Sequence, residues 1–256
     1  MVMGRWYNGL ATSIAKAVCL GMLAASFFLS PVYAQDVSAA INDIVPAATG
    51  TGASAPAAQH AGLASWIAPG AVKKMAGWVL ESGDNRGLAF MVVDKSEAKV
   101  FAFGKSGEFL GTAGVLIGLA HGDDSVPGIG TMRLAQITPD MRTTPAGRFV
   151  AILGHDLGKL NVLWVDYPTA ISLHRVINTN KAERRLERIA SKAPADHRIS
   201  YGCINVPVQF FDSVVEPAFR GTQGIVYILP EVKEMRAVFP SYYDIDDPGK
   251  AQAALN

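Results

Sequence analysis

Short apolar runs, separated by turn residues, fill the chain from residue 88 onward. Residues 88–94 and 99–103 are the clearest pair, with the polar turn Lys95-Ser96-Glu97 between them. Runs of this length are typical of strands in a buried sheet and are too short for most helices. Further strands are predicted at 111–119, 149–153, 162–167, 171–176 and 224–229. The sequence therefore predicts a mostly β fold with short helices.

Three segments have the spacing of amphipathic helices. In residues 71–81 one face gathers four apolar side chains, those of Val72, Met75, Ala76 and Val79. Gly83 is placed to end that helix. Residues 183–191 interleave arginine with glutamate, which is typical of a solvated helix face. Residues 207–219 are amphipathic and follow the cysteine discussed below. We expect the short helices at these three places.

The N-terminal segment, residues 1–34, has the pattern of an export signal. Arg5 and Lys16 supply positive charge, residues 17–29 are almost entirely apolar, and Val32-Tyr33-Ala34 offers small residues for cleavage after Ala34. An uncleaved anchor is the alternative, but the apolar run is shorter than the roughly 20 residues that span a bilayer. We therefore predict export to a bacterial periplasm, with no stable membrane span after cleavage.

The rest of the chain divides by composition. Residues 35–65 are rich in Ala, Gly and Pro with few large apolar side chains, which predicts a flexible linker. Residues 66–87 form a helix and lead-in, 88–230 the main domain, and 231–256 a C-terminal tail that we expect on the surface. The net charge of +1, with no basic stripe, argues against nucleic acid as a partner.

The chain has two cysteines, and only one belongs to the expected mature protein. Cys19 lies in the export signal, which leaves Cys203 without a disulfide partner. It follows a polar, turn-prone stretch and comes directly after Gly202, which allows a tight backbone turn. A structural buried thiol is the alternative. We interpret Cys203 as a nucleophile.

A thiol attacks an amide as thiolate, so it needs an imidazole to take its proton. His174 is the favoured base, because the predicted strand 171–176 would hold its ring rigidly; a core histidine is the alternative. His197 is the rival, but Asp196-His197-Arg198 reads as a polar loop in which a solvated histidine is expected. The backbone N–H groups of Tyr201, Gly202 and Cys203 are predicted to converge as an oxyanion hole.

Three segments together resemble the YkuD family of L,D-transpeptidases. They are Ile171-Ser172-Leu173-His174, Ser200-Tyr201-Gly202-Cys203-Ile204 and Thr144-Pro145-Ala146-Gly147-Arg148-Phe149. Residues 90–95 and 100–103 are similar to the opening hairpin of that family. The resemblance covers about 88–230 and implies a YkuD-like β-sandwich or barrel catalytic domain. It also implies that the backbone carbonyl of Arg175 orients the histidine, and that no cofactor is needed.

The sequence departs from that pattern in three places. Tyr201 stands where the family has a histidine, and Asn205 stands where it has an arginine. The stretch between the histidine and the cysteine is longer, with the charged segment 183–191 inserted, which suggests a modified lid or acceptor site. Substrate contacts are predicted for Ser200, Tyr201, Asn205 and Arg198. For Ser200 we favour local support of the turn over substrate contact, and for Tyr201 wall packing is an equal alternative.

The resemblance implies an exported cysteine L,D-transpeptidase that acts on peptidoglycan stem peptides through a thioester. A hydrolase or carboxypeptidase with the same Cys–His site is one alternative, and a catalytically silent wall-binding domain is another. His121-Gly122-Asp123-Asp124 invites a metal interpretation, but its ligands are too close together to form a site alone. We expect that segment to be a loop with solvated charges, and we predict no metal.

Overall fold

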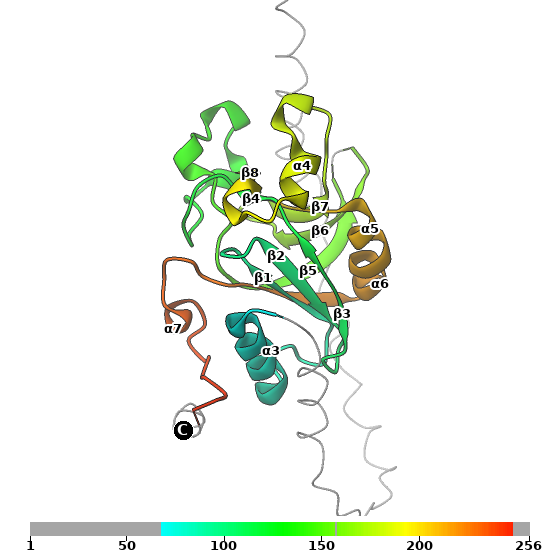
Figure 1. The fold of residues 1–256 in the computed structure, drawn as a ribbon, viewed down its shortest axis with the longest axis vertical. Helices are drawn as coiled ribbons and strands as arrows, with labels where there is room; N and C mark the ends of the chain where they lie inside the picture. Colours follow the sequence, from blue (N-terminus) through cyan, green and yellow to red (C-terminus); the bar gives the residue numbers. More distant parts are fainter. Residues whose placement is uncertain (1–67, 157, 248–256) are drawn as a thin grey trace, which may run out of the picture.

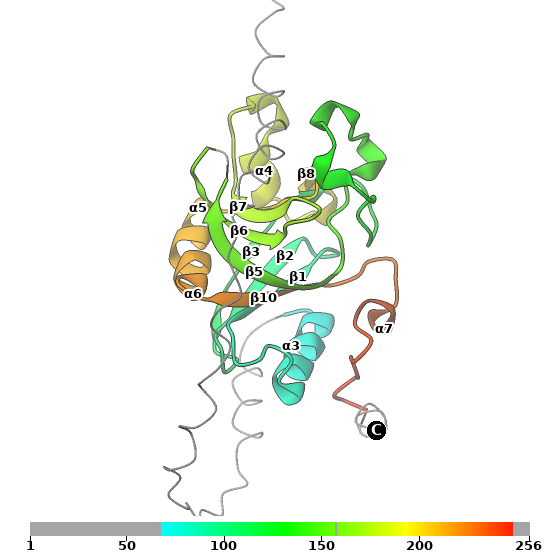
Figure 2. The same cartoon turned by 180° about the vertical axis from the view of Figure 1, so that it is seen from behind.

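A computed structural model describes residues 68–156 and 158–247. One mixed sheet dominates this part of the chain, with strand order β3-β2-β1-β10-β5-β6-β7-β9. Figures 1 and 2 show the sheet curling around itself, with short helices outside it. The strands are β1 Phe90–Asp94, β2 Lys99–Phe103, β3 Phe109–Gly114, β5 Gly147–His155, β6 Asn161–Asp166, β7 Ile171–Arg175, β9 Ile204–Val206 and β10 Gln223–Ile228. The mostly β fold with short helices is confirmed.

The sheet is closed almost into a barrel by one contact between its two ends. Leu116, just after β3, forms a β-bridge with Asn205 in β9 at the opposite edge. The two residues exchange backbone hydrogen bonds of 2.9 and 2.8 Å. A core of apolar side chains from most of the strands fills the interior, and Phe211, Val215 and Phe219 complete it. Closure satisfies backbone groups that an open edge would leave unpaired.

A second core lies on the outer side of β1 and β2. In β1, Met91 and Val93 face the interior, whereas Phe90 and Val92 face helix α3 (Gly70–Ser82). Because both faces of β1 are covered, its sequence is a continuous apolar run. The helix buries the four predicted residues and ends at Gly83, whose φ of 67° suits glycine. The predicted helix at 71–81 is confirmed.

The C-terminal part contributes to this second core, so its expected place on the surface is wrong. Helix α7 (Met235–Val238) leads into Phe239, Tyr242 and Tyr243, which are all buried against the α3 side of the molecule. Aromatic side chains this large are stabilised strongly by burial, so the segment that carries them packs against the domain. The ring of Trp78 lies edge-on to Tyr242, with centroids 5.6 Å apart. Residues 1–67 and 248–256, with the whole of the predicted export signal and linker, lie outside the described residues.

Two predicted elements differ in detail. The strand expected over 111–119 is divided: β3 ends at Gly114, and β4 (Ile117–Gly118) pairs instead with β8 (Arg198–Ser200). The helix expected over 207–219 consists of α5 (Val208–Phe210), a π-helical turn (Phe211–Val215) and α6 (Glu216–Phe219). Strands as short as β8 and β9 carry too few residues for an alternation pattern, so the sequence did not reveal them.

Two lobes project from the same end of the barrel in both views (Figures 1 and 2). One contains three 3-10 turns, at Ile129–Thr131, Leu134–Gln136 and Pro139–Met141. The other contains α4 (Arg185–Ala190), the inserted helix expected at 183–191. Within the described residues, no helix combines the length and the apolar character that a membrane crossing requires.

Candidate active site

Two parallel neighbouring strands bring His174 and Cys203 together. β7 pairs with β9 in the register Leu173↔Ile204 and His174↔Asn205. Leu173 and Ile204 point into the core, so the residues next to them on each strand point to the other face. His174 and Cys203 therefore share the face that looks away from the core. The structure brings together the favoured base and the nucleophile that the sequence predicted.

The thiol and the imidazole perturb each other's ionisation. Burial raises the pKa of Cys203, but a hydrogen bond to His174 and the charge on that ring outweigh it and lower the pKa below its ordinary value. Burial lowers the pKa of His174, yet the thiol's hydrogen bond and charge raise it above its ordinary value. Both shifts favour a thiolate beside an imidazolium, which is the reactive form of a cysteine nucleophile.

The other side of the imidazole is fixed by the backbone. Nδ1 of His174 lies 2.8 Å from the carbonyl oxygen of Arg175. A carbonyl only accepts, so Nδ1 carries a hydrogen and donates it. Nε2 is then the ring nitrogen available to the thiol of Cys203. The same carbonyl was expected at this place from the family resemblance, and it fixes the tautomer that proton transfer needs.

Ser172 is a member of the site that sequence reasoning missed. Its hydroxyl lies 3.7 Å from the sulfur of Cys203, and its side chain is buried. Hydrogen bonds from its backbone and hydroxyl both lower the pKa of the thiol. Alternation on β7 could have identified it, because Ser172 and His174 are two residues apart and therefore share a face.

The turn before Cys203 requires glycine. Gly202 has a φ of +126°, and a Cβ placed there would lie 2.7 Å from the carbonyl oxygen of Thr143 and 2.7 Å from Cδ1 of Ile171. Ser200 supports the same turn: its hydroxyl donates to the Cys203 carbonyl at 2.7 Å and accepts from the Gly202 N–H at 3.0 Å. These bonds explain why a serine, a glycine and a cysteine occur at this spacing.

Those bonds correct one prediction and agree with the role favoured for Ser200. The Gly202 N–H is already bound to Ser200, so its predicted place in an oxyanion hole is wrong. Ser200 is buried and its hydroxyl is bonded within the turn, so the structure assigns this residue the support of the turn rather than substrate contact. The N–H groups of Tyr201 and Cys203 have no hydrogen-bond partner among the described residues. They are the donors left for an oxyanion.

Thr144 fixes the orientation of the peptide that follows Gly202. Its hydroxyl donates to the Gly202 carbonyl at 2.7 Å and accepts from the Gly118 N–H at 2.8 Å. A trans peptide places its C=O and N–H on opposite sides, so holding the Gly202 carbonyl inward turns the Cys203 N–H outward. The family resemblance includes the segment that begins at Thr144, but it predicts no role for this threonine.

The two departures from the family pattern have different surroundings. Tyr201 is 38% exposed, and the guanidinium of Arg142 lies 3.9 Å from its ring centroid. Asn205 is buried, with its amide carbonyl accepting from Arg185 Nη1 at 2.8 Å and its N–H₂ donating to the Cys203 carbonyl at 3.3 Å. Asn205 therefore links the inserted helix α4 to the nucleophile turn, and its side chain is not open to substrate as predicted.

Arg198 was predicted to contact substrate, but its guanidinium is engaged inside the protein. It is paired with Glu231 and donates to the carbonyl oxygens of Gly118 and Ala120 at 3.4 and 3.1 Å. Its side chain is 9% exposed. A buried guanidinium with these partners holds loops together.

The rival base, His197, is buried rather than solvated. Its Nδ1 lies 2.8 Å from the Val115 carbonyl oxygen and its Nε2 lies 3.0 Å from that of Ser191. With both ring nitrogens engaged by backbone carbonyls, the ring has no nitrogen free for a thiol. His197 connects the end of α4 to the barrel, and the polar-loop interpretation of this residue is wrong.

The loop at 121–124 also differs from its prediction. Asp123 is buried, and its carboxylate accepts from the Lys95 ammonium at 2.7 Å and from three backbone N–H groups, those of Glu231, Val232 and Lys233. These partners outweigh burial and lower the pKa of Asp123 to about 2. The charge is neutralised inside the fold rather than solvated. No group of three metal-ligating side chains occurs in the described part of the chain.

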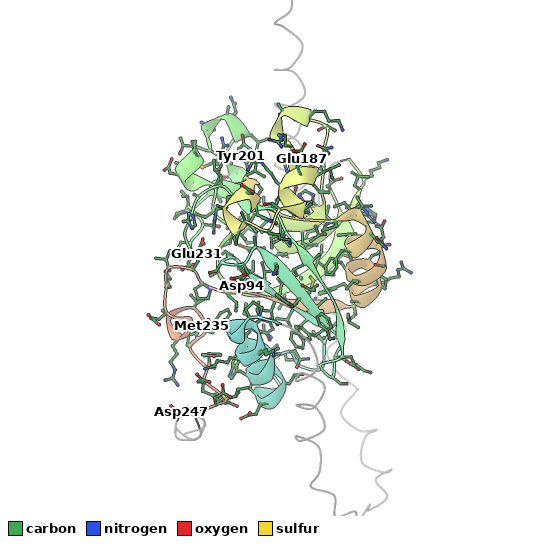
Figure 3. The ribbon with its side chains drawn as sticks, in the orientation of Figure 1. Asp94, Glu187, Tyr201, Glu231, Met235 and Asp247 are labelled. Carbon is green, nitrogen blue, oxygen red and sulfur yellow. The ribbon has the colours of Figure 1, made fainter. Side chains whose placement is uncertain are left out.

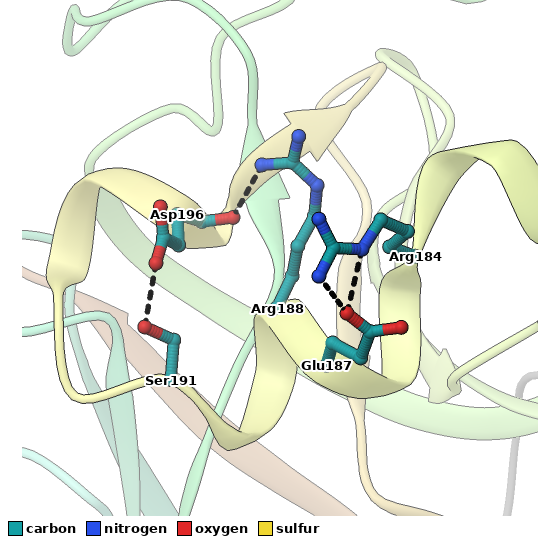
Figure 4. Close-up of a pocket in the computed structure, with 5 residues that line it drawn as sticks. All are labelled: Arg184, Glu187, Arg188, Ser191 and Asp196. Carbon is teal, nitrogen blue, oxygen red and sulfur yellow. Dashed lines mark hydrogen bonds and ion pairs between the residues drawn. The ribbon is translucent and has the colours of Figure 1, made fainter.

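Two cavities lie at this end of the molecule. One, of about 400 Å³, reaches Ser172 and His174 and has a mostly apolar wall, made of Leu160, Val162, Val176, Ile177 and Val208. The other, of about 330 Å³, lies on α4, where the lining side chains bond to one another (Figure 4). Arg184 pairs with Glu187, and Asp196 accepts from Arg188 and Ser191. The first cavity reaches His174, the candidate base, and is the candidate substrate site.

Comparison with known proteins gives remote likenesses. No family model and no curated protein matches the chain. Among solved structures it is similar to the helical cell shape determining protein Pgp2 from Campylobacter jejuni, with 13% identity, 61% of this chain, 55% of that chain and a TM-score of 0.38. It is also similar to the LD transpeptidase LdtMt1 in complex with imipenem, with 14% identity, 55% of this chain, 58% of that chain and a TM-score of 0.32.

A third structure, the catalytic domain of the E. faecium L,D-transpeptidase, is 13% identical over 55% of this chain and 96% of that domain, with a TM-score of 0.29. The chain spans little more than half the length of the first two structures. Likenesses this remote carry no argument about activity. The site itself, an imidazole on β7 and a thiol in the turn that leads into the adjacent strand β9, defines a candidate cysteine acyltransferase or hydrolase.

Proposed function

We propose that this protein is an exported cysteine L,D-transpeptidase that acts on peptidoglycan stem peptides in the periplasm. One observation carries the proposal: Cys203, directly before β9, interacts with His174 on the neighbouring strand β7, and each moves the other's pKa toward the thiolate–imidazolium form. The motif resemblance supplies the substrate class. The predicted signal at residues 1–34 supplies the route out of the cytoplasm.

The first half-reaction is acylation. The Cys203 sulfur bonds to the carbonyl carbon of the stem peptide, and the carbonyl electrons move onto oxygen, where the N–H groups of Cys203 and Tyr201 stabilise the charge. When the carbonyl re-forms, the C–N bond breaks. The His174 imidazolium gives its Nε2 proton to the leaving amine, so the terminal D-amino acid departs neutral at nitrogen and a thioester remains.

The second half-reaction returns the thiolate. The side-chain amine of a second stem attacks the thioester carbonyl, and His174, now neutral, takes the proton that this amine loses. The C–S bond then breaks, which forms a new amide cross-link and restores the Cys203 thiolate beside an imidazolium. Water in place of the amine would give a carboxylic acid by the same steps. The acceptor therefore decides between transfer and hydrolysis.

Intact-protein mass spectrometry tests the nucleophile. Wild-type protein is expected to gain the mass of one carbapenem molecule, because the thiolate opens the lactam without a leaving group. The Cys203→Ala variant is expected to gain nothing while it keeps the wild-type circular dichroism. A folded wild-type protein that forms no adduct would support the wall-binding alternative.

Product analysis then separates transfer from hydrolysis. The protein is incubated with a tetrapeptide stem that ends in D-alanine, with and without a second stem that carries a free side-chain amine. A cross-linked dimer is the expected product when the acceptor is present. Tripeptide acid as the sole product under both conditions would assign the protein to the hydrolases.

A further inference from the structure

Three arginines contact the segment around Cys203, and they differ in whether a carboxylate pairs with the guanidinium. Arg198 is paired with Glu231, and Arg185 is paired with Glu183. Arg142 lies on the ring of Tyr201 and has no carboxylate within ion-pair distance among the described residues. A cation that is ordered but lacks a counter-ion beside a nucleophile is suited to an anionic ligand.

Arg142 is held in place without using up its donors. Its Nε and Nη2 donate to the Ile137 carbonyl at 3.4 and 3.2 Å, and one face of the guanidinium covers the Tyr201 ring. No acceptor among the described residues bonds to its Nη1. The side chain is therefore ordered before any ligand arrives, which reduces the entropy cost of binding.

The backbone places Arg142 alongside the nucleophile turn. The next residue, Thr143, has its carbonyl oxygen so close to Gly202 that a Cβ there would approach within 2.7 Å. Thr144, the residue after that, bonds to the Gly202 carbonyl. Tyr201 itself is two residues before Cys203. Figure 3 shows Tyr201 at the end of the molecule that carries the two lobes.

We infer that Arg142, seated on Tyr201, binds a carboxylate of the stem peptide close to the bond that Cys203 attacks. The inference rests on the proposed function and adds a recognition residue to it. A peptide that loses its terminal residue necessarily carries a carboxylate one residue beyond the scissile bond, and a diaminopimelate residue carries another. Planar guanidinium groups pair with carboxylates through two parallel hydrogen bonds.

Binding to a variant that cannot react tests the inference directly. In the Cys203→Ala background, calorimetry measures the affinity for three tetrapeptide stems: the free acid, its C-terminal amide, and the stem amidated at the diaminopimelate carboxylate. One of the two amides is expected to bind about tenfold more weakly than the free acid, and it identifies the carboxylate that is recognised. Adding Arg142→Gln is expected to weaken the free acid to that same level and to remove the difference.

Equal weakening of all three peptides by Arg142→Gln would assign Arg142 a structural role only and overturn the inference. An unchanged preference for the free acid would overturn it as well. Arg142→Lys keeps the charge without the planar fork, so part of the preference is expected to remain; a folded lysine variant that treats acid and amide alike also refutes the inference. Arg236→Gln is the matched control, because Arg236 is exposed and follows Met235, far from Tyr201 in Figure 3.

The two proposals fail in different ways. If no stem peptide binds and wild-type protein forms no thioester, the proposed function and the inference fall together. If stems bind and acylate Cys203 while the charge at Arg142 makes no difference between acid and amide, only the inference fails.

Discussion

Two groups of charges lie near the turn that carries Cys203, and they are built in opposite ways. In the first group, Lys95, Asp123, Glu231 and Arg198 form a buried network. The Lys95 ammonium lies 2.7 Å from Asp123 and 3.6 Å from Glu231, and it also donates to the carbonyls of Gly122 and Thr144. Each charged group in this network has an opposite charge beside it.

In the second group, the charges are incompletely matched. Cys203 and His174 carry opposite charges only while the proton is on the imidazole, and both are neutral when it returns to sulfur. Arg142 rests on an aromatic ring instead of a carboxylate. The comparison shows that the matched charges in this molecule hold the chain in place, whereas the charges without a fixed partner lie at the turn that carries Cys203, where a ligand can complete them.

The largest expected effect comes from removing His174, the proposed base. His174→Ala is expected to slow carbapenem acylation about 10²–10⁴-fold, the usual contribution of a positioned proton acceptor. The imidazole lowers the pKa of Cys203, while burial of the thiol raises it. Without the ring, burial remains, so the thiol pKa rises and the acid limb of the alkylation rate moves to higher pH. Iodoacetamide labelling followed by mass spectrometry across pH measures this shift.

The wild-type profile for transfer has a second limb with the opposite sign. The pKa of His174 is raised, so its imidazolium persists above the pH at which an ordinary histidine is neutral. Protonation of the leaving amine is therefore lost only as pH rises through that raised value, and the rate of transfer is bell-shaped. His197→Ala is the contrasting variant: it should lose stability yet keep the acid limb. An acid limb that moves in His197→Ala and stays in His174→Ala would reverse the assignment of the base.

Breaking the saturated network is expected to cost stability rather than chemistry. Asp123→Asn leaves the Lys95 ammonium buried without its closest counter-charge, which typically costs about 3–5 kcal/mol of unfolding free energy. Asp124→Asn is the control, since that carboxylate is exposed and pairs with the exposed Lys233, and it is expected to change stability by less than about 1 kcal/mol. Urea denaturation measures both variants.

The same aspartate predicts a pH dependence of stability. Its folded pKa of about 2 lies below the unfolded value of about 4, so its contribution is complete above the unfolded pKa and is lost as pH falls through 2. Asp123→Asn lacks this group and should lose that part of the acid slope. An identical slope in wild type and variant would show that Asp123 is not the carboxylate responsible.

The comparison also explains which features the sequence could predict. The apolar face of α3, with Val72 and Val79, and the fully buried strand β1 could be predicted, because each pattern is contained in a short stretch of sequence. The pairing of Cys203 with His174 was predicted because a thiol and an imidazole are chemically distinctive, and the structure places the two side chains together. The roles of Arg198 and Arg142 were not legible, since pairing with Glu231 or with Tyr201 depends on contacts between segments far apart in the chain.

A smaller effect is expected where the two regions meet, at Thr144. The Thr144→Val variant keeps the shape of the side chain but leaves the Gly118 N–H and the Gly202 carbonyl without their partner, which costs about 1–3 kcal/mol for each buried group. The Cys203 N–H is then held less rigidly toward the oxyanion, so acylation should slow about tenfold. The acid limb of the pH–rate profile should not move. Thr144→Ser, which keeps the hydroxyl, should restore most of the rate. Stopped-flow acylation at several pH values measures both.

The smallest effect is expected at Arg185, which joins the inserted helix α4 to the site from the side. Its guanidinium bonds to Asn205, and its charge lowers the pKa of His174 against the larger effect of the thiol. Arg185→Gln should therefore raise the His174 pKa further and move the alkaline limb of transfer to higher pH, with only a few-fold change in the maximal rate. Arg184→Gln is the control, because Arg184 is exposed and pairs with Glu187. A shift in Arg184→Gln equal to that in Arg185→Gln would mean that the general charge of the lobe, rather than the contact with Asn205, sets the histidine's ionisation.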